Sequence, residues 1–330
     1  MTVLMRKDPS ISVVLVNLAE IDSSDRVYAV TPGWFPVETL KRSVQSIGIR
    51  VPLWLERTDG PRLRLVSGFR RFKVAQQLEI DEIPAIITPA QECRETFIDV
   101  LWENLGFRPL TDTEKAIVLR KLIRKFSFTE AQLLQDILPI LKLRADRYHL
   151  ERYLKIAELP DLLQEAMMLG RLSVDTALEL SRWEDEEQLF LVELIRKYQL
   201  GRNKQKELVQ ILGDLKSIKK MEVVGVWEKS GASEIEKHPG LSPQDRLAGI
   251  RTALRRLRYP QLTHHEKRYR ELKNSLKLPR GLRLSVPNYF EGSEVSVTMS
   301  AKSARELRDL VKESQCLFEQ EGLDQIFELL

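Results

Sequence analysis

Cysteine and histidine are scarce in this sequence. Two cysteines, Cys93 and Cys316, and four histidines are spread over 330 residues. So few cysteines exclude a disulfide framework and a zinc cluster built on cysteine. They favour a reducing compartment, and we therefore expect a cytoplasmic protein.

Long hydrophobic runs are missing as well. No stretch approaches the roughly 18 apolar residues of a transmembrane helix, so we expect no membrane partner. The first ten residues, MTVLMRKDPS, lack the basic and then apolar plan of a signal peptide. Two catalytic motifs are also absent, because no G-x-x-x-x-G-K-[ST] loop occurs and His264-His265-Glu266 does not match H-E-x-x-H.

The net charge is small, but its parts are opposed. The chain carries 52 Lys and Arg against 48 Asp and Glu, a net charge of +4. Residues 246–283 hold twelve basic and two acidic residues, and residues 108–155 hold eleven basic and six acidic residues. Residues 284–330 hold four basic and nine acidic residues. This segregation favours a nucleic-acid partner, although basic residues on a helix face can also be there only for solvation.

The hydrophobic pattern changes near residue 94. Before it, short apolar runs that predict strands alternate with stretches of helical spacing. The strands are expected at 11–16, 51–55, 63–66 and 83–87, and the helices at 37–47 and 69–78. After it the pattern is helical, until two alternating runs at 282–286 and 295–299 predict a second small sheet. The fold class is therefore α+β.

The same changes of pattern divide the chain. We expect an α/β domain over 1–93 and an all-helical domain over 94–220. Residues 221–243 contain the stretch EKSGASEIEKHPGLSP, which is typical of a linker. Residues 244–330 are expected to form a basic helical arm and a small α/β unit that could serve in dimerisation.

The stretch Ser67-Gly68-Phe69-Arg70-Arg71 predicts a phosphate site. A strand ends, a glycine turns the chain, and a helix begins with Arg70 and Arg71 in its first turn. Free backbone N–H groups, the positive end of the helix and two guanidinium groups then converge on one place. The competing interpretation is that both arginines only pair with local carboxylates.

Glu103 and Asn104 stand together near the predicted end of a helix. A carboxylate next to an amide can hold Mg²⁺ on a nucleotide phosphate. Such pairs are also ordinary residues of helix ends, so this motif gains weight only from its neighbours.

Two predicted helices, 129–138 and 145–156, have the spacing of a helix-turn-helix. In that motif the second helix enters the major groove of DNA, where arginine reads guanine and tyrosine or histidine contacts phosphates or base edges. The candidate DNA-binding residues are Arg144, Arg147, Tyr148, His149 and Arg152. An ordinary helical hairpin is the competing interpretation.

Taken in order, these motifs resemble the ParB/RepB partition-protein family over about half of the chain. The family's G-E-R-R-x-x-A-A is met by Gly68-Phe69-Arg70-Arg71-Phe72-Lys73-Val74-Ala75. Its E-N-[LI]-Q-R is met by Glu103-Asn104-Leu105 followed by Gly106-Phe107. Further matches are Gly48 to Pro52, Ile83-Pro84, Pro109 to Ala116, Leu159-Pro160 and Gly170-Arg171-Leu172-Ser173.

The resemblance implies a ParB/sulfiredoxin-like N-terminal domain and a chromosome or plasmid partition clamp. Gly68, Arg70 and Arg71 would bind the phosphates of CTP, and Glu103 and Asn104 would hold Mg²⁺. It also implies DNA, a second copy of the chain and a ParA-type ATPase as partners, and a place on the nucleoid. Phe69 stands where the family has glutamate, so at most slow CTP hydrolysis is expected.

Two other classes remain as alternatives. A sulfiredoxin-like phosphotransferase would need a cysteine in this loop, where the chain has Phe69. A helix-turn-helix transcriptional regulator with a ParB-like domain and no nucleotide hydrolysis would use the same DNA-binding residues.

Overall fold

The computed structural model describes residues 12–276, 278–318 and 321–330. Ile11 of the first expected strand and Lys277 of the basic segment lie outside them. The chain divides into two compact units, which meet in sequence at Gln205 and Lys206. The four-part division expected from the sequence is finer than this, and its boundaries stay predictions.

A mixed five-stranded sheet, in the order β1-β5-β3-β4-β2, forms the N-terminal part of the first unit. The strands are β1 (Val13–Asn17), β2 (Ile21–Asp22), β3 (Leu53–Glu56), β4 (Leu63–Ser67) and β5 (Glu82–Thr88). β3 runs antiparallel to β4 and parallel to β5, while β1 runs antiparallel to β5. The sheet therefore contains the expected hairpin, formed by β3 and β4. β4 leads directly to Gly68 and the predicted phosphate site.

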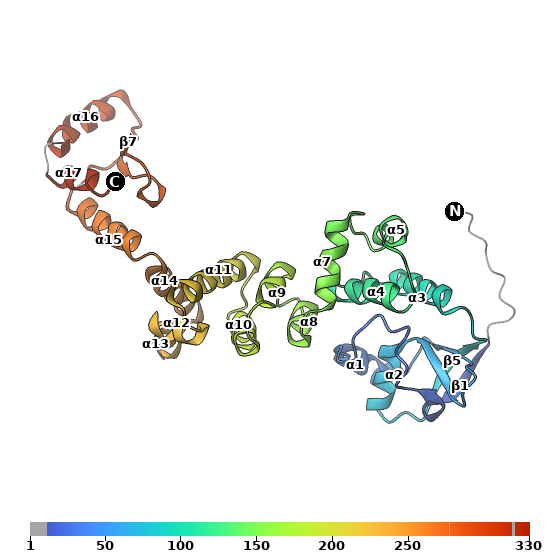
Figure 1. Cartoon of the computed structure of the whole chain (residues 1–330). Helices are drawn as coiled ribbons and strands as arrows, with labels where there is room; N and C mark the ends of the chain where they lie inside the picture. The colour runs from blue at the N-terminus through green and yellow to red at the C-terminus, as the bar shows by residue number, and fades with distance from the viewer. Residues whose placement is uncertain (1–11, 277, 319–320) are drawn as a thin grey trace. The chain divides into compact units, whose positions relative to one another are not determined.

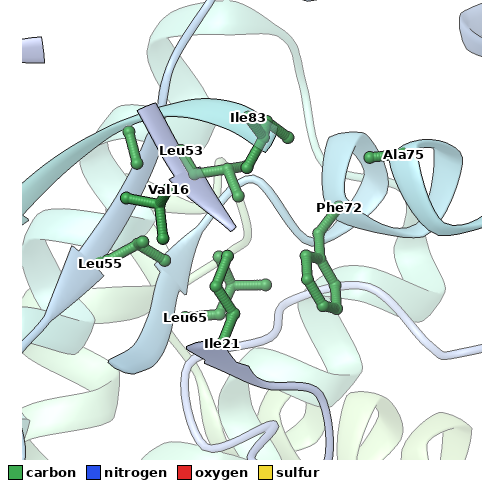
Figure 2. Packing of buried hydrophobic residues seen from close by; sticks show 9 residues of the cluster. Val16, Ile21, Leu53, Leu55, Leu65, Phe72, Ala75 and Ile83 are labelled. Carbon is green, nitrogen blue, oxygen red and sulfur yellow. The ribbon is translucent and has the colours of Figure 1, made fainter. Parts of the chain in front are cut away.

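Helix α2 (Phe69–Gln77) packs on one face of this sheet, and helix α1 (Glu38–Ile47) packs against α2; Figure 1 shows both beside the strands. Phe72 and Ala75 of α2 pack onto every second strand residue, such as Leu53 and Leu55 of β3. Successive side chains of a strand point to opposite faces, so only every second one meets the helix. Figure 2 shows this cluster around Leu53, Leu55 and Leu65. This packing holds α2 against the sheet, and the predicted phosphate site lies at the start of α2.

The rest of the first unit is helical, as expected. Its helices are α3 (Cys93–Phe107), α4 (Asp112–Arg124), α5 (Glu130–Gln132), α6 (Leu138–Ile140), α7 (Arg147–Ala157), α8 (Asp161–Met168), α9 (Val174–Leu180) and α10 (Asp185–Lys197). α11 (Arg202–Lys219) begins in the first unit and ends in the second. A sheet followed by separate helices is the predicted α+β class.

The first helix of the predicted helix-turn-helix differs in one detail. The sequence predicts its end at residue 138, but the chain stays helical through Pro139 to Ile140. A π-helical turn over Leu133–Ile137 lets the N–H of Leu138 bond to the carbonyl of Leu133. Pro139 then lies in the first turn of α6, where its missing N–H is not needed.

In the second unit, helices occupy much of the stretch expected as a linker. α12 (Val223–Lys229) and α13 (Ala232–Lys237) fall within residues 221–243. Val223, Val226 and Trp227 are buried at helical spacing, so this stretch gains more from packing than an exposed linker would.

The remaining elements of this unit form a basic helical pair and a hairpin. They are α14 (Pro243–Arg258), α15 (Pro260–Ser275), β6 (Leu282–Ser285), β7 (Ser296–Met299), α16 (Ala304–Phe318) and α17 (Glu321–Phe327). β6 and β7 pair antiparallel, as the alternating runs predicted. Leu272, Leu284 and Ile326 form the centre of their own hydrophobic cluster.

Candidate nucleotide and DNA sites

The chain turns from β4 into α2 at Gly68. Its φ of +99° lies in the left-handed region, which side chains with a Cβ rarely adopt. A Cβ at this position would also lie 2.5 Å from Cδ2 of the buried Leu53. Glycine is therefore required here by both backbone and packing, and the turn brings the first N–H groups of α2 to the surface of a cleft.

No side chain caps the N-terminus of α2. The first N–H groups of a helix have no partner within the helix, and they carry the positive end of its dipole. Arg70 and Arg71 are in this first turn. The start of α2 therefore has the electrostatic character of an anion site, as the sequence predicted.

A cleft of about 340 Å³ opens at this turn. β4, α2 and α3 all contribute to its walls, together with the segment 28–31. Its lining includes Gly68, Arg70, Arg71, Glu103 and Asn104. The fold thus brings all five predicted nucleotide-site residues into one cleft, although two separate helices carry them.

One wall of the cleft is held by a lysine from the helical part. The Lys121 ammonium of α4 donates to the carbonyl oxygens of Arg26, Val27 and Ala29, at 2.5, 3.1 and 2.7 Å. Burial lowers the pKa of Lys121 to about 8. This contact fixes the segment that places Tyr28 and Thr31 in the cleft wall.

The guanidinium of Arg71 forms hydrogen bonds within the chain. Its Nη1 donates to the carbonyl oxygen of Val51 at 2.8 Å and to that of Pro52. Burial lowers the pKa of Arg71, and the charge of Glu103 opposes that shift. Arg71 therefore joins α2 to the segment before β3 while its guanidinium lines the cleft.

Arg70 has a different environment. Its guanidinium carbon lies 4.2 Å from the centroid of the Phe35 ring. Its Nε is buried and has no hydrogen-bond partner. Burial, and then the charge of Arg108, lowers the pKa of Arg70. A buried donor without a partner is costly, so this atom is suited to an anion that enters the cleft.

Glu103 and Asn104 of α3 face the cleft from the other side. Oε2 of Glu103 is buried without a hydrogen-bond partner. The Asn104 amide nitrogen donates to the carbonyl oxygen of Val100 at 2.8 Å, which leaves its oxygen as the atom able to bind a metal. Among the residues that the structure describes, no group of three or more His, Cys, Asp or Glu could hold a metal ion. A Mg²⁺ ion at this pair would therefore need phosphate oxygens as further ligands, which is its usual mode in nucleotide sites.

Sequence reasoning missed two residues of the cleft region, Phe35 and Arg108. Arg108 lines the cleft, and its guanidinium binds both carboxylate oxygens of Glu114, at 2.8 and 2.5 Å. The hydrogen bonds that Arg108 donates to Glu114 raise the pKa of Arg108. The only local signal was a basic residue close after Glu103-Asn104, and nothing in the sequence connected it to Phe35.

The predicted DNA-reading helix is α7, which packs against α4 and the π-helical turn. Asp146 caps it, accepting a 2.8 Å bond from the His149 N–H. Arg144, Arg147 and Tyr148 are 81%, 74% and 67% exposed near its N-terminus. Arg144 and Arg147 form ion pairs with Asp146 and Glu151, at 3.1 and 2.9 Å, but these three side chains stay exposed, as those of a recognition helix must be.

The other two predicted DNA-binding residues, His149 and Arg152, are less exposed and are engaged within the chain. His149 Nδ1 lies 2.8 Å from a carboxylate oxygen of Asp146. The Arg152 guanidinium forms an ion pair with Asp175 of α9. The contact of Arg152 could not be read from the sequence, because its partner lies in another helix.

Comparison with known proteins identifies the domain that contains this cleft. The family model described as the ParB N-terminal domain matches residues 11–105, which include every predicted nucleotide-site residue. Residues 11–105 are therefore a ParB-type N-terminal domain.

Curated relatives of this chain are nucleoid occlusion proteins. The chain is 27% identical over 137 residues to that of Lysinibacillus sphaericus, covering 42% of this chain and 44% of the relative. It is 26% identical over 184 residues to that of Listeria monocytogenes serovar 1/2a, covering 55% and 62%. It is 30% identical over 132 residues to that of Geobacillus kaustophilus, covering 40% and 44%. The chain thus spans about half the length of the curated relatives it matches.

Solved structures of ParB proteins are similar only in part. The C-terminally truncated chromosome-partitioning protein ParB from Caulobacter crescentus complexed with CTP-gamma-S matches with a TM-score of 0.25 and 19% identity, over 56% of this chain and 98% of that one. The same protein complexed to the centromeric parS site matches with a TM-score of 0.32 and 18% identity, over 60% and 98%. The assignment to the ParB type depends on the sequence matches and not on these superpositions.

Among the helices that the structure describes, none is both long enough and apolar enough to cross a membrane.

Proposed function

We propose that this ParB-type protein binds CTP with Mg²⁺ in the N-terminal cleft and DNA through α7, as a partition-type clamp. The observation that supports the nucleotide site best is the meeting of five predicted residues in one cleft with two unpartnered charged atoms. These atoms are Nε of Arg70 and Oε2 of Glu103. They are of opposite charge, as the phosphate and metal ends of a magnesium nucleotide require.

In this proposal, separate residues of the cleft bind the phosphates and the metal ion. Gly68 exposes the N–H groups at the start of α2, and Arg70 and Arg71 add positive charge for the phosphates. Glu103 and the Asn104 oxygen hold the metal ion. Bound Mg²⁺ would supply charge neutralisation between the phosphate oxygens.

Calorimetric titration of CTP and ATP, with and without Mg²⁺, tests this site. We expect binding of CTP that needs Mg²⁺ and that Arg70→Ala weakens by roughly 10- to 100-fold, because charge-assisted hydrogen bonds are lost. Glu103→Gln should remove most of the Mg²⁺ dependence. Arg42→Ala is the matched control, because Arg42 is an exposed arginine of α1 outside the cleft. Unchanged CTP affinity in Arg70→Ala would overturn the phosphate assignment.

Hydrolysis is expected to be slow at most. Glu103 is the one carboxylate in the lining of the described cleft, and in this proposal it is committed to the metal. Phe69 stands at the position of the family's glutamate, and its ring lies 5.4 Å from the Arg26 guanidinium carbon. No second carboxylate of the lining is left to orient a water molecule.

DNA binding is proposed on the exposure of Arg144, Arg147 and Tyr148 and on the charge around them. Arg147 pairs with Glu151 at 2.9 Å, and both side chains are more than half exposed. Exposed ion pairs contribute little stability, so such an arginine exchanges its partner for a phosphate at little cost. The engaged Arg152 and His149 are expected to contribute less.

Titrating duplex DNA recovered by genomic pull-down at several salt concentrations tests this surface. We expect the double variant Arg144→Ala/Arg147→Ala to bind more weakly and to lower the slope of log K against log salt by about 2, if both side chains contact phosphates. Arg42→Ala again serves as the control. An unchanged slope would show that DNA is bound elsewhere.

The biological setting remains part of the proposal. A homodimer, a ParA-type ATPase and a place on the nucleoid belong to the partition hypothesis, and the matched relatives carry the name nucleoid occlusion protein. A transcriptional regulator without nucleotide hydrolysis is the second hypothesis. DNA binding that is unaffected by CTP would favour the regulator.

A further inference from the structure

An ion pair joins the predicted DNA-reading helix to α9. Nη2 of Arg152 in α7 donates to the carboxylate oxygen Oδ1 of Asp175, which lies in the first turn of α9. Burial opposes the charge of Arg152, but the hydrogen bond and the charge of Asp175, with a smaller contribution from Tyr148, raise the pKa of Arg152. The side chain of Arg152 is 25% exposed and that of Asp175 is 79% exposed. The arginine is thus held against the protein, while the carboxylate that holds it faces solvent.

This pair lies in a groove on the exposed face of α7. The opposite face of the helix buries Leu150, Tyr153 and Ile156. The groove has a volume of about 530 Å³. Its lining includes Tyr148, Glu151, Arg152 and Lys155 of α7 and Asp175 and Glu179 of α9. A partner that contacts the exposed face of α7 therefore meets the carboxylates of α9 as well.

Acidic side chains outnumber basic ones in this groove. Four carboxylates and three cationic side chains belong to its lining. Besides Arg152, Arg182 is also paired, with Glu179 at 3.0 Å. The start of α7 is different, because Arg144 and Arg147 are mostly exposed there. A phosphate gains little from surroundings of negative net charge, so the groove suits a ligand other than the DNA backbone.

An arginine held beside a carboxylate is complementary to one kind of base pair. In the major groove, guanine presents the acceptors O6 and N7, and its paired cytosine presents the N4 amino donor. A guanidinium has five N–H donors, of which the contact with Asp175 uses one, and the second carboxylate oxygen of Asp175 is able to accept. The donors of Arg152 and the acceptor of Asp175 therefore match the edge of a G·C pair. A phosphate offers only acceptors and is repelled by the carboxylate.

We propose that Asp175 is a specificity-determining residue of the DNA surface, which together with Arg152 reads a G·C base pair in the major groove. Arg152 donates to the guanine, and Asp175 accepts from the amino group of the cytosine. The carboxylate also keeps Arg152 from phosphates, so the pair increases the selectivity among sequences and adds little to the affinity for DNA in general. This inference rests on the proposed DNA binding through α7 and adds to it a residue of another helix.

The test measures the affinity of the full chain and its variants for two labelled duplexes at several salt concentrations. One duplex is recovered by genomic pull-down, and the other has the same base composition in shuffled order. Asp175→Asn should bind the shuffled duplex more tightly and steepen its slope of log K against log salt by about 1, because Arg152 then pairs with a phosphate. The preference for the recovered duplex should fall by about tenfold, since a direct contact to a base pair is lost. Glu179→Gln is the matched control, because it removes a carboxylate that lines the same groove but pairs with Arg182.

Replacing the G·C pairs of the recovered duplex one at a time by A·T locates the contact. At one position the replacement should cost the unmodified chain about tenfold in affinity. The same replacement should cost Asp175→Asn and Arg152→Ala much less, because each variant lacks one half of the pair. Glu179→Gln should keep the full effect at that position.

The outcomes separate this inference from the proposed function. If the unmodified chain binds neither duplex, the proposed DNA binding itself fails. If Arg144→Ala/Arg147→Ala weakens binding but Asp175→Asn matches Glu179→Gln in salt slope and in preference, only the role of Asp175 is wrong. Equal binding of both duplexes by the unmodified chain would overturn it as well. So would an equal loss of affinity for both duplexes in Asp175→Asn, because a residue that merely stabilises α9 would affect them alike.

Discussion

At the scale of single residues, two positions have a conformation or a contact that few other residues could provide. Gly68 combines a left-handed backbone with contact to a fully buried leucine. Asp146 is the N-cap of α7. Its carboxylate accepts a hydrogen bond from the His149 N–H and also contacts the ring nitrogen of His149. Both positions lead to measurable consequences.

Replacing Gly68 by alanine should destabilise the first unit. The strained backbone alone costs about 1–3 kcal/mol, and the contact with Leu53 adds to it. Gly106→Ala is the matched control, since a Cβ there meets nothing within 4 Å and alanine is favoured in α3 by up to about 1 kcal/mol. Urea unfolding measures both variants, and equal stabilities would contradict the geometry of this turn.

The cap of α7 should weaken in acid. Hydrogen bonds from His149, first from its backbone and then from its ring, hold the pKa of Asp146 below its usual value. A carboxylate whose pKa is lower in the folded state stabilises it above the unfolded pKa, and this contribution is lost as the pH falls through the folded pKa. Hydrogen exchange of the His149 amide, corrected for the intrinsic rate, should therefore lose protection below about pH 4.

Asp146→Asn separates this effect from other titrations. Asparagine still accepts the hydrogen bond of a cap but does not change charge with pH. Its His149 amide should show a flatter dependence on pH than that of the unmodified chain. A decline of the same size in both proteins would assign the acid sensitivity to other carboxylates.

At the scale of elements, helix α4 connects the two halves of the first unit. Its N-terminus holds the capping box of Thr111 and Glu114, and Glu114 also holds Arg108 at the cleft. Further along the same helix, Lys121 binds the segment that forms another wall of the cleft. Residues of one helix therefore support both the cleft and the helical part of the unit.

Thr111→Ala should lower the free energy of unfolding by about 1 kcal/mol, because the hydroxyl that accepts from the Glu114 N–H is lost. Thr111→Ser keeps that hydroxyl and should stay close to the unmodified chain. Chemical unfolding followed by circular dichroism measures the difference. If serine and alanine are equally destabilising, the methyl group matters and the cap does not.

At the scale of the whole molecule, two compact units carry separate hydrophobic clusters. Leu53 lies in the first and Leu284 in the second, and both are almost fully buried. Substitutions at sites that share no partners have nearly additive effects on stability. The charge is divided as well, with the basic α14 and α15 preceding an acidic tail in the second unit.

Calorimetry should therefore resolve two transitions. Leu53→Ala and Leu284→Ala should each lower a different one, by about 2–5 kcal/mol of unfolding free energy. The double variant should show both shifts, nearly additive. One common transition that moves with either substitution would mean that the units unfold together.

Much of the fold and part of the site could be predicted without coordinates. The strand and helix periodicities, the hairpin and the glycine turn before Phe69 depend on neighbours in sequence, and all were found there. The continuation of the helix through Pro139 was not, because the π-helical turn that makes room for the proline leaves no simple pattern. The helices α12 and α13 were hidden by a composition that is typical of linkers.

By itself, the sequence determined the α+β class, the ParB-type motifs and their order, and the opposed charges of the segments. These properties follow from local periodicity and from residue types at short spacing. Only the tertiary structure decided which charged groups are paired and which are left for a partner. Arg152 meets Asp175, Arg108 meets Glu114, and Arg70 meets Phe35 while its Nε stays unpartnered. The partners come from different elements, so no local pattern encodes these contacts, and they form only when the elements pack.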